Sequence, residues 1–138
     1  MKLVHAADLH LDSALTGLTR YESAPVDEIR GATRRAFANL VSLCLEERAS
    51  VLVISGDLFD SDWRDVSTGL FFAAQLSKLC EAGVRVVWIR GNHDAVSQIR
   101  RSVRLPEKVI ELRADRAETR VFDELGDNVT DESAAAKA

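Results

Sequence analysis

Residues 51–60 read VLVISGDLFD, an aliphatic run that leads through a serine and a glycine into an acidic segment. The aliphatic part is continuous rather than alternating, which is typical of a central parallel strand covered on both faces. Gly56 permits a sharp turn directly after the strand, and Asp57 lies in that turn. Ligands of open α/β sheets bind beyond the carboxyl ends of the strands. The stretch therefore predicts an α/β fold with a polar site at one edge of its sheet.

The same arrangement, an apolar run followed by polar residues, occurs at two other places. Residues 2–6 lead into Asp-Leu-His at residues 8–10, and residues 84–89 lead into Gly-Asn-His-Asp at residues 91–94. Each apolar run predicts a buried strand. Because the carboxyl ends of parallel strands lie at one edge of a sheet, the three polar clusters are expected to converge there.

Helical patterns separate the three predicted strands. Residues 32–48 repeat apolar side chains at i, i+3, i+4 and i+7, which predicts an amphipathic helix after a long loop over residues 11–31. The predicted buried face of this helix consists of Phe37, Leu40, Val41, Cys44 and Leu45.

A second helix is expected between the second and third strands. Asp65 or Ser67 can cap its first turn. It is expected to end near Ala82, where Gly83 supplies a residue with left-handed backbone. Its predicted buried side chains are Leu70, Phe71, Ala74, Leu79 and Cys80. This alternation of strands and helices predicts parallel strands joined by right-handed crossovers.

The sequence after the third polar cluster is less regular. Residues 95–104 predict a short helix, and residues 109–112 and 120–122 predict two further strands. Residues 127–138 are polar, rich in alanine and without an apolar stripe, which predicts a frayed helix or a disordered tail. The folded part of the domain is therefore expected to span residues 1–126.

The composition is that of an ordinary globular protein, with 46% hydrophobic and 29% charged residues among 138. Cys44 and Cys80 lie in apolar helical stripes, which predicts reduced core thiols and a cytoplasmic location. No segment approaches the ~20 consecutive apolar residues of a transmembrane helix, so no membrane partner is expected. The net charge is −4, and the acidic excess lies in residues 106–138. This balance disfavours a basic nucleic-acid coat protein but is compatible with a metal-dependent enzyme.

The polar clusters contain the residue types that bind a pair of divalent cations. Asp57 is the natural bridging carboxylate, and Asp8 and His10 are two residues apart, so both side chains can face one ion. Asn92 offers a neutral amide oxygen to a second ion. Two cations about 3.5–4 Å apart can clamp a phosphate and activate a water molecule. The pattern therefore predicts a metal-dependent phosphoesterase.

Two further residues of the third cluster have acid–base chemistry. His93 is predicted to be the general acid that protonates the leaving oxygen, and Asp94 to orient the His93 imidazole. Asp12 and Asp60 are predicted to support the site or to cap turns rather than to ligate a metal.

The amino-acid sequences of the three clusters also resemble motifs of a known family. HAADLHLD at residues 5–12, GDLFD at 56–60 and RGNHD at 90–94 look like the first three motifs of the calcineurin-like metallophosphoesterase superfamily. More specifically, they are similar to bacterial SbcD-type DNA repair exonucleases. The stretch at residues 62–72 is similar to the YhaO-like branch of that group.

This resemblance implies an α/β/β/α sandwich, of which this chain would form the N-terminal part. It implies two divalent ions, usually Mn²⁺, the hydrolysis of DNA phosphodiesters, and a coiled-coil ATPase partner of the SbcC type. By the same likeness Asp8, His10 and Asp57 bind the first metal. Asp57 and Asn92 bind the second, and His93 assists catalysis.

The sequence also departs from the family pattern. The family has two further metal-binding motifs, a lone His and then Gly-His-x-His, whereas the last of the three histidines here is His93. We therefore expect the 138 residues to be the N-terminal part of a phosphoesterase domain whose hydrolysis is impaired. Such a part would expose a sheet face or edge, through which a homodimer is expected to form.

Other interpretations of function and of DNA contact stay open. The chain could act on small phosphodiesters or cyclic nucleotides, or it could be a non-catalytic fragment that binds metal weakly. Arg100, Arg101 and Arg104 form a basic cluster, either a solvated helix face or a contact for DNA phosphates.

Overall fold

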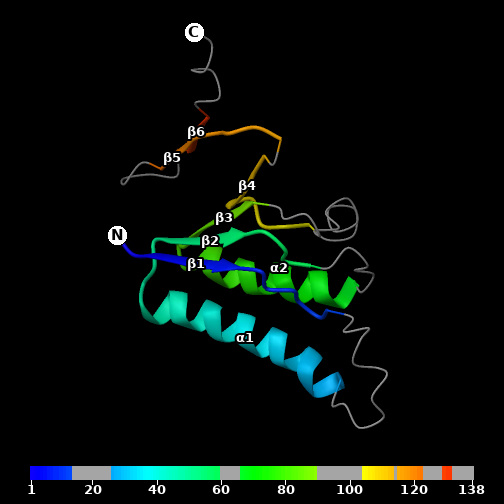
Figure 1. Cartoon of the computed structure of the whole chain (residues 1–138). Coiled ribbons are helices and arrows are strands. Elements are labelled where there is room, and N and C mark those ends of the chain that lie inside the picture. Colours follow the sequence, from blue (N-terminus) through cyan, green and yellow to red (C-terminus); the bar gives the residue numbers. More distant parts are fainter. Residues whose placement is uncertain (14–25, 60–65, 90–103, 114, 123–128, 132–138) are drawn as a thin grey trace.

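The structure is a computed structural model of the 138-residue chain, and it describes residues 1–13, 26–59, 66–89, 104–113, 115–122 and 129–131. Two helices and six strands lie in these ranges (Figure 1). In chain order they are β1 (Leu3–Ala7), α1 (Val26–Glu46), β2 (Val51–Ser55), α2 (Val66–Glu81), β3 (Arg85–Ile89), β4 (Val109–Leu112), β5 (Arg120–Phe122) and β6 (Val129–Asp131).

The first four strands form one parallel sheet in the order β1-β2-β3-β4. Ala7 at the end of β1 pairs with Ser55 at the end of β2, which in turn pairs with Ile89 at the end of β3. The carboxyl ends of these three strands are therefore level at one edge of the sheet. β5 and β6 form a separate antiparallel pair. The parallel sheet and its helices confirm the predicted α/β class.

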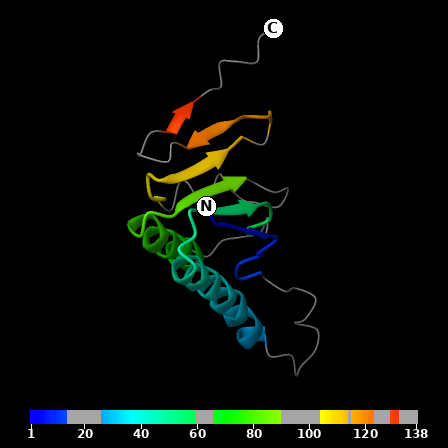
Figure 2. The same ribbon diagram turned by 90° about the vertical axis from the view of Figure 1, so that its left-hand side faces the viewer.

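Both helices lie side by side on one face of the parallel sheet (Figures 1 and 2). The core fills the space between this face and the helices. Leu52 and Trp88 of the sheet, and Phe37 and Phe72 of the helices, are all inaccessible to solvent. Burial of such side chains stabilises each element by roughly 1.5–3 kcal/mol per residue, so the packing of α1 and α2 on this face defines the domain.

The opposite face of the sheet carries no helix among the described residues. A pocket of about 390 Å³ lies on it, lined mainly by apolar side chains such as Leu3, Val53 and Val87. The Arg85 guanidinium stacks 5.1 Å from the ring centre of Phe122 beside this pocket.

The predicted buried face of α1 is confirmed. Phe37, Val41 and Cys44 are buried, and Leu40 and Leu45 pack partly buried against the same core. The helix begins at Val26, six residues before its predicted start. Gly31 suggested a loop in the sequence but lies within the helix, because the packing of α1 outweighs the low helix propensity of one glycine.

The predicted face of α2 is only partly correct. Leu79 and Cys80 are buried as expected and Phe71 is partly buried, but Leu70 is 56% exposed and Ala74 is also exposed. The buried stripe instead runs through Thr68, Gly69, Phe72, Gln75, Leu76, Leu79 and Cys80. Two buried positions, Thr68 and Gln75, are polar. The apolar pattern therefore predicted a buried face centred on Phe71, whereas the helix buries the face that contains Phe72.

Of the remaining boundaries, the end of α2 agrees with the sequence, whereas β6 lies in the segment predicted to be a frayed helix or a disordered tail. Gly83 has φ +82° and ends α2 as predicted, and its N–H donates a hydrogen bond to the Cys80 carbonyl at 3.2 Å. The helix predicted at 95–104 lies outside the described residues, except for Arg104, which is not helical. Within 127–138, Val129–Asp131 form β6, and the other residues of that range are not described.

The two cysteines are free and buried, as predicted. Burial raises the pKa of both thiols above their ordinary value, which makes them poor nucleophiles. No helix in the described part of the chain is long and apolar enough to span a membrane.

The aromatic centre of the core gives a stability prediction. The Phe72 ring centre lies 5.4 Å from that of Phe37, 5.6 Å from that of Phe59 and 6.1 Å from that of Trp88. Phe72→Ala should therefore lower the free energy of unfolding by about 3–5 kcal/mol. Urea denaturation followed by circular dichroism measures this loss. Leu70→Ala, on the exposed side of the same helix, is the control, and an equal loss there would contradict the assigned core.

Candidate metal centre

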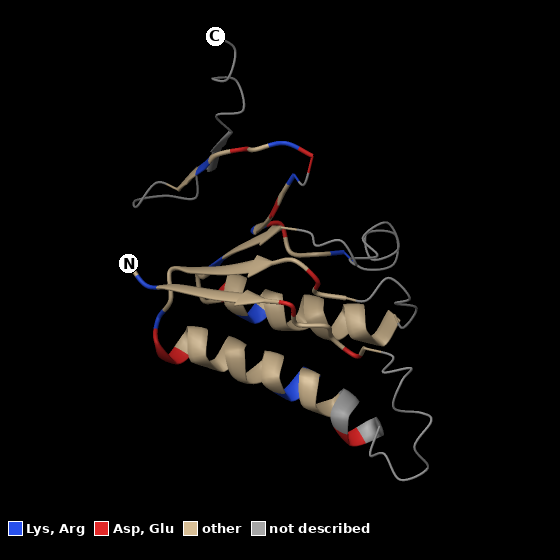
Figure 3. Ribbon diagram, in the orientation of Figure 1, with Lys and Arg blue, Asp and Glu red and all other residues tan. Residues whose placement is uncertain are grey.

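The candidate site is formed by the turns that follow β1 and β2. Asp8 and His10 lie in the first turn and Asp57 lies in the second. Since β1 and β2 are paired in register up to Ala7 and Ser55, the two turns leave the sheet side by side. Acidic segments follow both strand ends at this edge of the sheet (Figure 3).

The backbone of both turns is left-handed at the candidate ligands. The φ angle is +52° at Asp8, +43° at His10 and +36° at Asp57, and Gly56 has φ +72°. Asp and His are among the few non-glycine residues enriched in this region. Each such residue costs on the order of 1–3 kcal/mol and persists only where its surroundings hold it. The geometry therefore requires strong local anchors.

Backbone hydrogen bonds supply these anchors. The N–H of His10 donates to the Asp57 carbonyl at 3.0 Å, and the N–H of Leu11 donates to the Leu58 carbonyl at 2.9 Å. These bonds continue the pairing of β1 and β2 beyond the strands. Leu11 and Leu58 are also fully buried in the core. The ligand-bearing residues are thus held between a paired strand on one side and buried leucines on the other.

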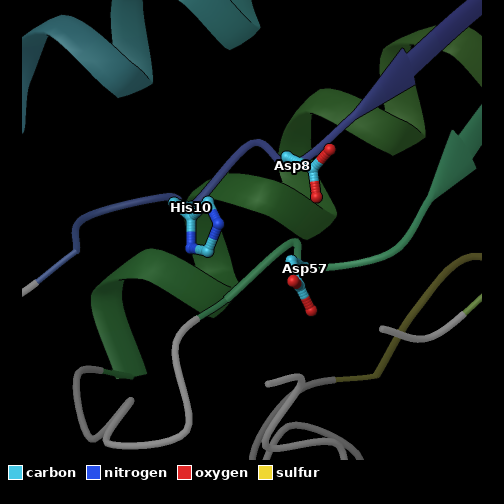
Figure 4. A group of neighbouring side chains, drawn as sticks. All are labelled: Asp8, His10 and Asp57. Carbon is cyan, nitrogen blue, oxygen red and sulfur yellow. The ribbon is translucent and has the colours of Figure 1, made fainter. Parts of the chain in front are cut away.

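The three side chains converge at this point (Figure 4). Potential ligand atoms of Asp8, His10 and Asp57 all lie within 4.8 Å of one another. Two ligands on one ion, each at about 2.0–2.2 Å, are at most about 4.4 Å apart, so small side-chain rotations suffice for coordination. Two carboxylates and an imidazole suit divalent ions such as Mn²⁺ or Zn²⁺. Asp8 is exposed and the other two are half-buried, which leaves an open side for water or substrate.

Several predicted site residues lie outside the described part of the chain. These are Asn92, His93, Asp94, Arg100 and Arg101. What the structure does describe is the end of β3, where the Gly56 N–H donates a hydrogen bond to the Ile89 carbonyl at 2.9 Å. β3 therefore ends beside the Asp57 turn.

Arg104, the remaining member of the basic cluster, lies in the described part of the chain. Its side chain is 91% exposed and pairs with Glu107 at 3.7 Å. Exposed pairs of this kind contribute little to stability. Its proposed contact with DNA phosphates is not tested by this position.

The structure also shows side chains around the site that the sequence did not identify. Asp12, expected only as a supporting residue or turn cap, contacts Arg34 of α1 and Thr68 of α2. Neither partner lies in a motif. The only signal for Thr68 is a polar residue within an apolar helix, which does not by itself indicate a role.

Comparison with known proteins agrees with this geometry. Residues 1–132 match the family model for calcineurin-like phosphoesterases. Since the match covers nearly the whole chain, the chain belongs to the calcineurin-like phosphoesterase family, a family whose hydrolases use divalent metals. The resemblance inferred from the three motifs is therefore confirmed.

Individual relatives are a phosphoesterase and two DNA repair proteins. The chain is 31% identical over 109 residues to the uncharacterized metallophosphoesterase YhaO of Bacillus subtilis, covering 79% of this chain and 27% of that protein. It is 37% identical over 95 residues to the DNA double-strand break repair protein Mre11 of Methanopyrus kandleri, with 68% and 19% covered. For Mre11 of Aeropyrum pernix the identity is 32% over 99 residues, with 70% and 22% covered. The chain thus spans only about a fifth to a quarter of these relatives.

The triad predicts how a ligand substitution acts on metal binding. Asp57→Ala should lower Mn²⁺ affinity at least tenfold, since the loss of even an outer partner of a metal ligand typically costs 10–100-fold. Isothermal titration calorimetry of the chain with MnCl₂ measures the change.

Glu47→Ala is a matched control because it also removes a carboxylate. Glu47 lies near the amino ends of β1 and β2, at the end of the sheet away from the candidate ligands. The Lys2 ammonium donates a hydrogen bond to its carboxylate at 2.6 Å and lowers the pKa of that carboxyl. Equal Mn²⁺ affinity for Asp57→Ala and Glu47→Ala would place the metal elsewhere.

Proposed function

We propose that this chain forms the metal-binding N-terminal part of a phosphoesterase that hydrolyses phosphodiester bonds of DNA. The observation that supports this most directly is the convergence of Asp8, His10 and Asp57 from two adjacent strand ends. A carboxylate–imidazole set with one open side suits a catalytic metal better than a structural one. We further propose that the site takes two divalent ions and that these are Mn²⁺.

Each residue of the three clusters has a role in this proposal. Asp8, His10 and Asp57 would hold one ion, and Asp57 and Asn92 would hold the other. When bound, the pair of ions would neutralise the phosphate and activate the attacking water.

His93 donates the proton that the leaving oxygen requires, and Asp94 orients the His93 imidazole. These two roles, like that of Asn92, rest on the sequence motif, because residues 90–103 are not described.

DNA as the substrate is favoured by the relatives. Two of them are named as DNA double-strand break repair proteins. Arg100, Arg101 and Arg104 would then contact the phosphates beside the metals. An SbcC-like coiled-coil ATPase, a homodimer and a cytoplasmic location belong to the same proposal, and the two free thiols favour the last of these.

For residues 1–138 alone we expect weak hydrolysis. The described triad supplies three ligands to one ion, and no histidine follows His93 in this sequence. Fewer protein ligands lower metal affinity and leave more coordination positions to water. Activity should therefore require high Mn²⁺ concentrations.

Hydrolysis of bis-p-nitrophenyl phosphate tests the proposed chemistry. We expect a Mn²⁺-dependent rate that Asp57→Ala abolishes, because the bridging carboxylate is lost. His93→Ala should lower the hydrolysis of DNA about 10²–10⁴-fold, the usual contribution of a general acid, and should lower the hydrolysis of this substrate less, because p-nitrophenolate leaves without being protonated. Release of p-nitrophenolate at 405 nm is the measurement, and a rate that survives both substitutions would refute this site.

Linear DNA and cyclic nucleotides separate the substrate classes. We expect nucleotides to be released from linear DNA in the presence of Mn²⁺, and a faster turnover of cyclic nucleotides would favour small phosphodiesters instead. If neither substrate reacts while calorimetry still shows Mn²⁺ binding, the chain is a non-catalytic metal-binding fragment.

A further inference from the structure

Asp12 ends the turn that bears the two ligands of β1. The N–H of Ser13 donates a hydrogen bond to the His10 carbonyl at 3.2 Å, so residues 10–13 form a tight turn. Asp12 occupies its third position with φ +54°, the position at which a type II turn requires a left-handed residue. The conformation of Asp12 is thus coupled to that of His10, which begins the same turn.

The Asp12 side chain is fixed by both helices. Its Oδ2 accepts a hydrogen bond from Arg34 Nε of α1 at 2.7 Å and another from Thr68 Oγ1 of α2 at 2.6 Å. The Asp12 N–H donates to Thr33 Oγ1 at 3.1 Å. The Asp12 side chain is only 12% exposed, and Thr68 is fully buried. Charge-assisted bonds in such a setting are short and directional.

Arg34 is itself held in place by residues of α2. Its Nη2 donates to Ser67 Oγ at 3.0 Å, and its guanidinium lies 5.4 Å from the ring centre of Phe71. Arg34 therefore connects α1 to the first turns of α2 as well as to Asp12. The β1 turn, α1 and α2 meet at this one carboxylate.

We propose that Asp12 is a positioning residue of the metal centre, and that Arg34 and Thr68 act through it to orient His10 toward Asp8 and Asp57. This inference rests on the proposed metal site. The turn of residues 8–12 has one end fixed by the pairing of Ala7 with Ser55. Asp12 fixes the other end. Without Asp12, the backbone bonds of His10 and Leu11 still hold the turn, but its last residues lose their side-chain anchor and the His10 imidazole is held less firmly beside the carboxylates.

A purely stabilising role predicts something different. An ion pair removed from water is often no more stabilising than apolar residues of the same volume. If the network only joined the helices, its loss would change the unfolding free energy and leave the metal affinity of the folded chain unaltered. Metal affinity and stability must therefore be measured on the same variants.

Thr68 offers the cleanest test because it is not one of the candidate ligands and its hydroxyl donates to Asp12. Thr68→Val removes the hydroxyl at nearly constant volume, and Thr68→Ser keeps it. We expect Thr68→Val to lower Mn²⁺ affinity about 10–100-fold, as for other outer partners of metal ligands, while Thr68→Ser stays within about threefold of wild type. Isothermal titration calorimetry measures affinity, and the ¹⁵N shifts of the His10 imidazole in the metal-free chain report its environment.

Asp12→Asn and Glu47→Gln complete the design. Asp12→Asn keeps the shape of the side chain but removes its charge, and should lower affinity as Thr68→Val does. Glu47→Gln breaks the ion pair with Lys2 at the end of the sheet away from the candidate ligands and should leave affinity unchanged. Should Thr68→Val fail to fold, Asp12→Asn decides the question by the same titration.

The outcomes separate this inference from the proposed function. If wild type binds Mn²⁺ and Thr68→Val and Asp12→Asn bind it equally well, the positioning role is wrong while the metal site stands. An equal loss for Thr68→Ser and Thr68→Val would also overturn it, since the hydroxyl would not matter. If wild type itself binds no Mn²⁺, the proposed metal site fails first.

Discussion

The parallel pairing of β1 with β2 is the constraint on which the candidate site depends. It brings Asp8 and Asp57 together although they are 49 positions apart in the sequence. The pairing does not stop with the strands, because His10 and Leu11 donate to Asp57 and Leu58. The ligands therefore sit on a continuation of the sheet rather than on free loops. Preorganisation of this kind is what a metal site needs to hold its ligands in place.

The core on one side of the sheet makes that pairing stable. Both helices pack against the same face, and the aromatic cluster around Phe72 joins α1, α2, β3 and the turn after β2. Phe59, two residues after Asp57, belongs to this cluster. The packing of the core therefore also fixes the position of the turn that contains Asp57. The opposite face, which carries no helix in the described part of the chain, holds the apolar pocket.

The strands and the ligand triad could be predicted from the sequence, whereas the supports around the triad could not. Continuous apolar runs that end in polar residues mark strand ends, and this placed Asp8, His10 and Asp57 at one edge. The network of Asp12 depends on contacts 22 and 56 residues away in sequence, for which no local pattern exists. The face of α2 was misjudged for a related reason, since buried Thr68 and Gln75 interrupt its apolar periodicity. The early start of α1 was missed because Gly31 has low helix propensity, which tertiary packing overrides.

The left-handed backbone at Asp8, His10 and Asp57 has a consequence for how this centre can change over evolutionary time. At such positions glycine and asparagine relieve backbone strain rather than add to it. Replacement of one of these candidate ligands by either residue would therefore remove a side chain that could bind metal and leave the domain folded, or even more stable. A single nucleotide change converts an aspartate codon to one for glycine or asparagine. The fold can thus persist after metal binding is lost, and single mutations should readily give relatives that keep the sheet but lack the candidate ligands.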